Sequence, residues 1–91
     1  MNVLIIEDEA PAYRRLAKLI GECDSSADIV GIIQSVKDGI EWFQSNPSPD
    51  LIFSDIQLAD DLSFTIFKKL NITVPIIFIT LFVIILLASS I

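Results

Sequence analysis

The sequence of 91 residues contains no histidine and a single cysteine. Without histidine, the chain cannot provide Ser-His-Asp or Cys-His catalysis, a histidine-ligated zinc site or a phosphohistidine of its own. With Cys23 alone, it cannot form an intrachain disulfide or a zinc site made only of cysteines. We expect Cys23 to be a small packing residue. The chemistry of this chain must therefore depend on carboxylates.

Basic residues are also scarce. Six Lys and Arg stand against twelve Asp and Glu, which gives a net charge of −6. The chain has no Lys/Arg cluster to bind a phosphate backbone, so we expect no nucleic-acid contact on this segment. The N-terminal residues have neither the basic charge nor the apolar run of a signal peptide. The apolar fraction of 53% indicates a folded chain. We therefore expect one small, acidic, cytoplasmic domain.

Short apolar runs alternate with amphipathic stretches along the chain. The runs predict buried strands at residues 3–6, 29–33, 51–53 and 74–80. A helix is expected from Pro11, a second after Ser35 with Asp38 three residues on as a capping box, and a third over residues 62–70. This alternation favours an α/β fold, a three-layer sandwich with a parallel sheet wrapped by helices.

Polar residues follow three of the predicted strands. Glu7 and Asp8 follow the first strand, Asp55 the third, and Thr80 ends the fourth. The carboxyl ends of parallel strands meet at one edge, where we expect these groups together. Clustered carboxylates repel one another unless a cation binds, and Mg²⁺ prefers oxygen ligands. A carboxylate beside Mg²⁺ can attack a phosphoryl group, to which Thr80 could donate a hydrogen bond. The alternative is a set of solvated loop carboxylates.

Three ordered motifs resemble the receiver domain of two-component response regulators. They are VLIIEDE at residues 3–9, PDLIFSDIQL at residues 49–58 and VPIIFIT at residues 74–80, and their details are most similar to LytTR-type regulators. The resemblance covers residues 1 to about 80. It implies the flavodoxin-like receiver fold. It also implies a phosphorelay role, in which a sensor histidine kinase is the phosphodonor and the domain is an acceptor rather than a turnover enzyme.

The resemblance assigns roles to individual residues. Asp55 would be the phosphoacceptor and Thr80 the switch hydroxyl. Glu7, Asp8, Asp55 and the backbone carbonyl of Gln57 would hold Mg²⁺.

The chain departs from the receiver pattern at residue 61. Asp61 stands where a glycine is usual, and an aspartate tolerates positive φ better than most residues. The alternative is that Asp60 or Asp61 caps the third helix.

A second departure follows Thr80. A receiver continues with a helix, a fifth strand ending in lysine and a last helix, whereas residues 81–91 are an uncharged, mostly apolar tail. By sequence order none of the four lysines replaces the missing one. We therefore expect a partial receiver domain over residues 1–80, truncated after the fourth strand, and an atypical tail over residues 81–91.

This tail leaves two further functions open. A signalling-defective receiver could act only as an interaction or dimerisation fragment. A membrane anchor is suggested by the twenty uncharged residues 72–91. However, the predicted strand 74–80 leaves eleven residues, which are too few to span a bilayer as a helix.

The fourth strand is expected to be a sheet edge with unpaired backbone groups. An in-chain hairpin onto it is not expected, because no Gly, Asn or Asp turn separates the tail from Thr80. We expect the tail either to continue as a short helix over the sheet or to pair with another chain. In both cases self-association through the fourth-strand edge and the apolar tail follows.

Overall fold

The computed structural model describes residues 1–79 in full and residues 84–87 as backbone. Within these residues the chain alternates strands and helices up to the fourth strand, and a fifth strand then follows without a helix. The elements in chain order are β1 (Asn2–Ile6), α1 (Ala10–Cys23), β2 (Asp28–Ile33), α2 (Val36–Ser45), β3 (Leu51–Asp55), α3 (Phe64–Leu70), β4 (Ile76–Ile79) and β5 (Ile84–Leu87).

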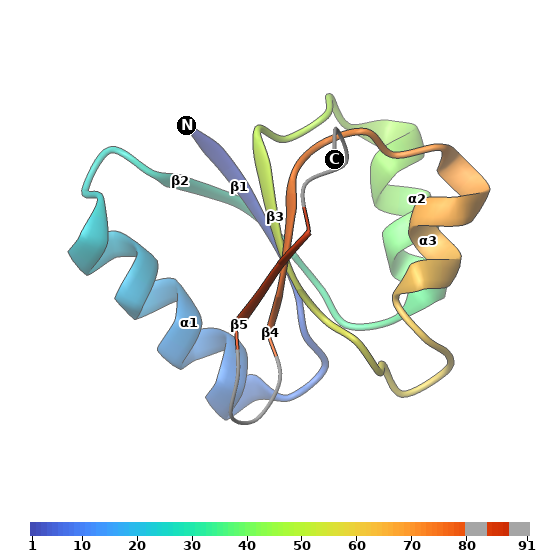
Figure 1. Cartoon of the computed structure of the whole chain (residues 1–91), viewed down its shortest axis with the longest axis horizontal. Coiled ribbons are helices and arrows are strands. Elements are labelled where there is room, and N and C mark those ends of the chain that lie inside the picture. The colour runs from blue at the N-terminus through green and yellow to red at the C-terminus, as the bar shows by residue number, and fades with distance from the viewer. Residues whose placement is uncertain (80–83, 88–91) are drawn as a thin grey trace.

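The strands form one sheet in the order β2-β1-β3-β4-β5. β2, β1, β3 and β4 are parallel, whereas β5 runs antiparallel to β4. In Figure 1, α1 lies on one side of the sheet, and α2 and α3 lie together on the other. The predicted α/β sandwich with a parallel sheet is therefore confirmed.

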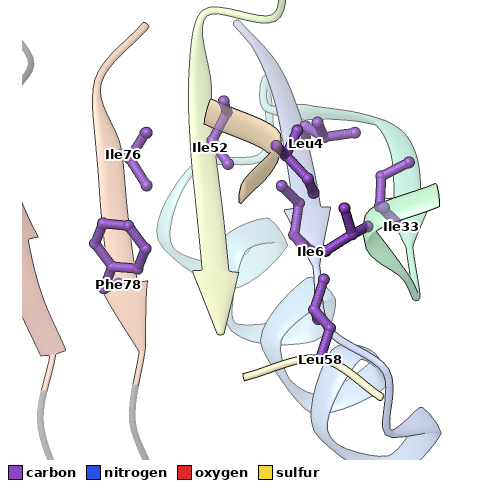
Figure 2. Packing of buried hydrophobic residues seen from close by; sticks show 9 residues of the cluster. Leu4, Ile6, Ile33, Ile52, Leu58, Ile76 and Phe78 are labelled. Carbon is purple, nitrogen blue, oxygen red and sulfur yellow. The ribbon is translucent and has the colours of Figure 1, made fainter. Parts of the chain in front are cut away.

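The core consists of two apolar clusters, one on each face of the sheet. β1 is completely buried from Val3 to Ile6, as expected of a central strand covered on both sides. Val3 and Ile5 belong to the cluster under α1, together with Ile20. The larger cluster lies under α2 and α3, and Figure 2 shows its side chains from several strands meeting on one face. Its buried members are Leu4, Ile6, Ile33, Val36, Ile52, Leu58, Ile66, Ile76 and Phe78.

The helix starts follow local signals in the sequence. α1 has its proline in the first turn, as predicted. At the start of α2 the backbone N–H of Asp38 donates to the Ser35 hydroxyl at 3.1 Å, which confirms the predicted cap. α3 begins at Phe64, two residues later than predicted, and ends at Leu70; the next residue, Asn71, is its C-cap and adopts the left-handed conformation with φ 53°.

The expectation that no hairpin forms on the fourth strand is wrong. Residues 84–87 pair antiparallel with β4, with Ile79 opposite Ile84 and Ile76 opposite Leu87. The expectation relied on a two-residue turn with Gly, Asn or Asp, but four residues, 80–83, connect these strands. Hairpin loops of four residues need no such pair, and the antiparallel strand satisfies backbone groups that β4 would otherwise expose. β5, not β4, is therefore the edge strand.

Trp42 of α2 is half-buried against the larger cluster. Cys23 was expected to pack inside, but it is exposed, because it is the last residue of α1. Among the described residues, no helix has the length and apolar character needed to cross a membrane.

Candidate functional site

The acidic residues predicted from the sequence meet at the carboxyl edge of the sheet. Asp55 is the last residue of β3, and Glu7 directly follows β1. The two strands are parallel neighbours with Ile6 opposite Ser54, so their next residues emerge side by side. Glu7, Asp8 and Asp55 each offer one carboxylate oxygen, and these three oxygens lie within 4.8 Å of one another. We call these three residues the acidic cluster.

The environment of the acidic cluster disfavours three free negative charges. All three residues are half-buried. The pKa of Glu7 is raised to about 7, mainly because burial removes the carboxylate from water and also because Asp8 and Asp55 are close. A proton or a cation on this cluster would relieve the repulsion.

Backbone groups orient two of the carboxylates. The N–H of Glu9 donates to Oε2 of Glu7 at 3.2 Å, and the N–H of Ile56 donates to Oδ1 of Asp55 at 2.8 Å. Each carboxylate is thus held by the chain immediately after its strand. This leaves the acidic cluster preorganised at the edge of the sheet.

The donor set fits a hard divalent cation. Oxygens bound to one Mg²⁺ at about 2.1 Å lie at most about 4.2 Å apart. The oxygens of the acidic cluster, which lie within 4.8 Å of one another, exceed this limit by at most about 0.6 Å. The carboxylates of Glu7, Asp8 and Asp55 are therefore suitable magnesium ligands.

The structure tests the roles of two other predicted site residues, Gln57 and Thr80, only in part or not at all. Gln57 lies two residues after Asp55 with an exposed side chain, and it forms a bridge with Leu62 across a tight turn. The role of its carbonyl as a metal ligand stays a prediction. Thr80, the predicted switch hydroxyl, lies outside the described residues.

The loop between β3 and α3 is attached to the end of β3 by Ser63. Its buried hydroxyl donates to the carbonyl of Asp55 and, at 3.2 Å, to that of Ile56. The N–H of Ser63 also donates to the carbonyl of Ile56 at 2.9 Å. The hydroxyl of Ser54 is a further donor to the Asp55 carbonyl, at 2.8 Å. The backbone that carries Asp55 is therefore tightly bonded.

Asp61 needs no positive φ at the position where receivers usually have glycine. Among the described non-glycine residues, Asn71 alone has positive φ. The Asp61 carboxylate accepts hydrogen bonds from the N–H of Leu62 at 2.7 Å and from the hydroxyl of Thr65 at 3.3 Å. These bonds do not cap α3, because its N-cap residue is Ser63 and no side chain accepts a capping hydrogen bond there, so the alternative prediction is wrong for Asp61.

Asp60 does something that sequence reasoning missed. It does not cap α3. Its carboxylate accepts hydrogen bonds from the N–H groups of Val36 at 2.9 Å and Lys37 at 3.2 Å, at the start of α2. These two bonds lower the pKa of Asp60. A cap from another element leaves no local pattern in the sequence, so only the structure reveals it.

A groove opens beside the acidic cluster. It has a volume of about 670 Å³, and α1 lines one side of it with residues that include Pro11, Arg15 and Leu19. Glu7 and Asp55 also line this groove. Two residues of the acidic cluster are therefore open to solvent through it.

The fold and the site together define a receiver-type domain. No protein-family model matches the chain. A search of curated proteins finds the sensory transduction protein LytT of Bacillus anthracis, 36% identical over 83 residues, which cover 88% of this chain and 33% of LytT. The chain thus spans about a third of the length of the curated relatives it matches.

Solved structures support the same class. The receiver domain of the Erythrobacter litoralis response regulator PhyR matches with a TM-score of 0.71 and 32% identity, over 85% of this chain and 60% of that one. PhyR of Bartonella quintana, solved in complex with the anti-sigma factor NepR, matches with a TM-score of 0.76 and 28% identity, over 94% of this chain and 40% of that one. The chain belongs to the receiver domains of response regulators.

Proposed function

We propose that this domain accepts a phosphoryl group on Asp55 from a sensor histidine kinase, in a reaction that depends on Mg²⁺. The observation that carries the proposal is the meeting of Glu7, Asp8 and Asp55 within 4.8 Å at the carboxyl edge of a receiver fold. The domain acts as an acceptor in a phosphorelay and not as a turnover enzyme. We place this activity in residues 1–80, in the cytoplasm.

The transfer is a displacement at phosphorus. A carboxylate oxygen of Asp55 attacks the phosphorus of the donor phosphohistidine and forms a new P–O bond. The P–N bond breaks, and its electron pair stays on the imidazole nitrogen, which takes up a proton. Asp55 then carries an acyl phosphate.

The neighbouring residues prepare Asp55 for this attack. Bound Mg²⁺ would neutralise charge on the phosphoryl oxygens. The carboxylates of Glu7 and Asp8 would bind the ion, and the backbone carbonyl of Gln57 would complete the set of protein ligands. The N–H of Ile56 holds the Asp55 carboxylate in one orientation. Thr80 would donate its hydroxyl to the phosphoryl group after transfer.

Phosphorylation with a small donor tests the proposal. The full chain is incubated with acetyl phosphate and MgCl₂, and intact mass spectrometry follows the gain of one phosphoryl group. We expect labelling that requires Mg²⁺ and is lost in Asp55→Asn. The rate of labelling should be lower than in a receiver with the fifth-strand lysine, because residues 81–91 contain no lysine that could bind the phosphoryl oxygens.

Asp28→Asn is a matched control, because it removes one carboxylate from an exposed strand start away from the acidic cluster. It should label like the wild type. Equal labelling of the wild type and Asp55→Asn would refute the assignment of Asp55.

A second candidate is a signalling-defective receiver that serves only as an interaction fragment. The antiparallel β5 favours it, because the receiver pattern has a parallel fifth strand ending in lysine at this place in the sheet. The PhyR complex with NepR is an example of a protein with this fold that binds a protein partner. Absence of labelling in a correctly folded wild-type protein would favour this second function.

A further inference from the structure

The loop between β3 and α3 contains a tight turn that reaches across to α2. Gln57 and Leu62 form a bridge at the base of the turn, and the N–H of Leu58 donates to the carbonyl of Asp61 at 2.9 Å. The side chain of Leu58 is 2% exposed and belongs to the larger core cluster. The turn is therefore compact, and Asp60 lies within it.

Asp60 binds the turn to the first residues of α2. Its two carboxylate oxygens accept from Val36 N–H at 2.9 Å and from Lys37 N–H at 3.2 Å, 24 and 23 positions away in sequence. The first N–H groups of a helix have no partner within the helix, so an aspartate there satisfies donors that need one. Another element thus provides part of the cap of α2.

The start of α2 is a firm attachment point. Val36 is 7% exposed and belongs to the larger core cluster, and Gly39 is buried against Ile66 of α3. α2 also has its own cap, the hydroxyl of Ser35. A turn bonded to this helix start is held relative to the sheet.

We propose that Asp60 is a positioning residue for the magnesium site, because its bonds to α2 hold the turn and thereby place the backbone carbonyl of Gln57 beside the acidic cluster. This inference rests on the proposed function, since the carbonyl has a ligand to bind only if Mg²⁺ occupies the site. Ser63 holds one end of the loop at the Asp55 carbonyl, and Asp60 holds the turn. Gln57 lies between these two attachments.

Asp61 provides a contrast within the same turn. It carries the same charge, but its carboxylate binds only the next residue and the first turn of α3. Substitution of either aspartate by alanine removes one negative charge at a similar position. A difference between the two variants therefore reports the bonds to α2 and not the charge.

The experiment measures Mg²⁺ affinity by isothermal titration calorimetry with MgCl₂ on the full chain. We expect Asp60→Ala to weaken binding about tenfold, the lower end of the range for residues that orient metal ligands. Asp61→Ala should change it much less. Asp60→Asn keeps a carbonyl oxygen as acceptor and should restore most of the affinity.

Ser35→Ala separates positioning from simple destabilisation. It removes the cap that α2 has of its own and leaves the bonds of Asp60 in place. We expect its Mg²⁺ affinity to stay at the wild-type level. Wild-type affinity in Asp60→Ala, or an equal loss in Ser35→Ala, would overturn the inference.

Hydrogen exchange without metal keeps this test separate from the proposed function. The amides of Leu58 and Ser63 bond inside the loop, so their exchange reports its order. Asp60→Ala should accelerate both about tenfold, and Ser35→Ala should not. No Mg²⁺ binding by the wild type would refute the proposed function, whereas unchanged exchange in Asp60→Ala would refute the positioning role.

Discussion

Glu7 is the residue whose protonation should change near neutral pH. Its pKa is about 7 in the folded chain against an ordinary value of 4.5, because it is partly buried and lies beside Asp8 and Asp55. Between these values the folded chain keeps a proton that the unfolded chain releases. The free energy of unfolding without metal should therefore decrease as the pH rises through this range.

Melting curves without metal test this at about pH 5.5 and about pH 8. We expect the lower melting temperature at the higher pH and a smaller difference in Glu7→Gln. Asp24 and Asp60 do not affect this comparison, because their pKa values lie below 3.8. Their contributions to the free energy of unfolding are lost only in more acidic solution. Mg²⁺ should stabilise the fold more at the higher pH, since it binds the deprotonated cluster. Equal melting temperatures at the two pH values would contradict the raised pKa of Glu7.

The residues of the acidic cluster were predictable, whereas Asp60 was not. Asp55 ends β3 and Glu7 directly follows its parallel neighbour β1, and strand ends can be read from the apolar runs before them. The bonds of Asp60 to α2 span 24 and 23 positions and depend on how a loop lies over a helix. Sequence spacing contains no signal for such a contact.

At the level of elements, hydrophobic periodicity predicted the three helices and the first four strands. Their boundaries differ by a few residues; the fourth strand is Ile76–Ile79 and not residues 74–80. β5 was missed because its residues were interpreted as a tail with no turn before it. Pairing with β4 depends on an open edge of the sheet, and this is a property of the assembled fold.

Two helical glycines should respond in opposite ways to alanine. Gly21 in α1 has nothing within 4 Å of an added Cβ, so Gly21→Ala should stabilise the chain by roughly 0.5–1 kcal/mol through helix propensity. Gly39 in α2 is buried, and an added Cβ would lie 2.6 Å from Cδ1 of Ile66 and 3.2 Å from Cγ2 of Ile33. We expect Gly39→Ala to destabilise the chain by about 1–3 kcal/mol, the usual cost of overpacking.

Urea denaturation measures both changes, and a second substitution tests the cause. Ile66→Val removes the Cδ1 methyl, so Gly39→Ala should cost less in that background than in the wild type. If Gly39→Ala instead raised the free energy of unfolding, α2 and α3 would have room for the added methyl group. The close packing described between these helices would then be wrong.

At the level of the whole molecule, the sheet formed by the described residues has two edges, β2 and β5, and three helices cover its faces. α1 is the helix that covers one face, and α2 and α3 share the other. Exposed apolar side chains remain on the α1 side, among them Leu19 at 48% and Ile32 at 39%. The described part of the molecule therefore has apolar surface and backbone groups available for a further contact.

The β5 edge leads to a prediction about self-association. Its four residues are all apolar, and its outer side has no strand partner among the described residues. Edge strands of this composition pair with other chains unless charge or proline prevents it. We expect the protein to form dimers or larger species at micromolar concentration, measured by light scattering.

Ile85→Lys should shift it towards monomer, because a lysine on an edge strand opposes pairing. Leu19→Lys is the control for a general gain in solubility and should shift it less. A monomeric wild type would show that β5 needs no partner, and an equal shift in both variants would place the contact elsewhere.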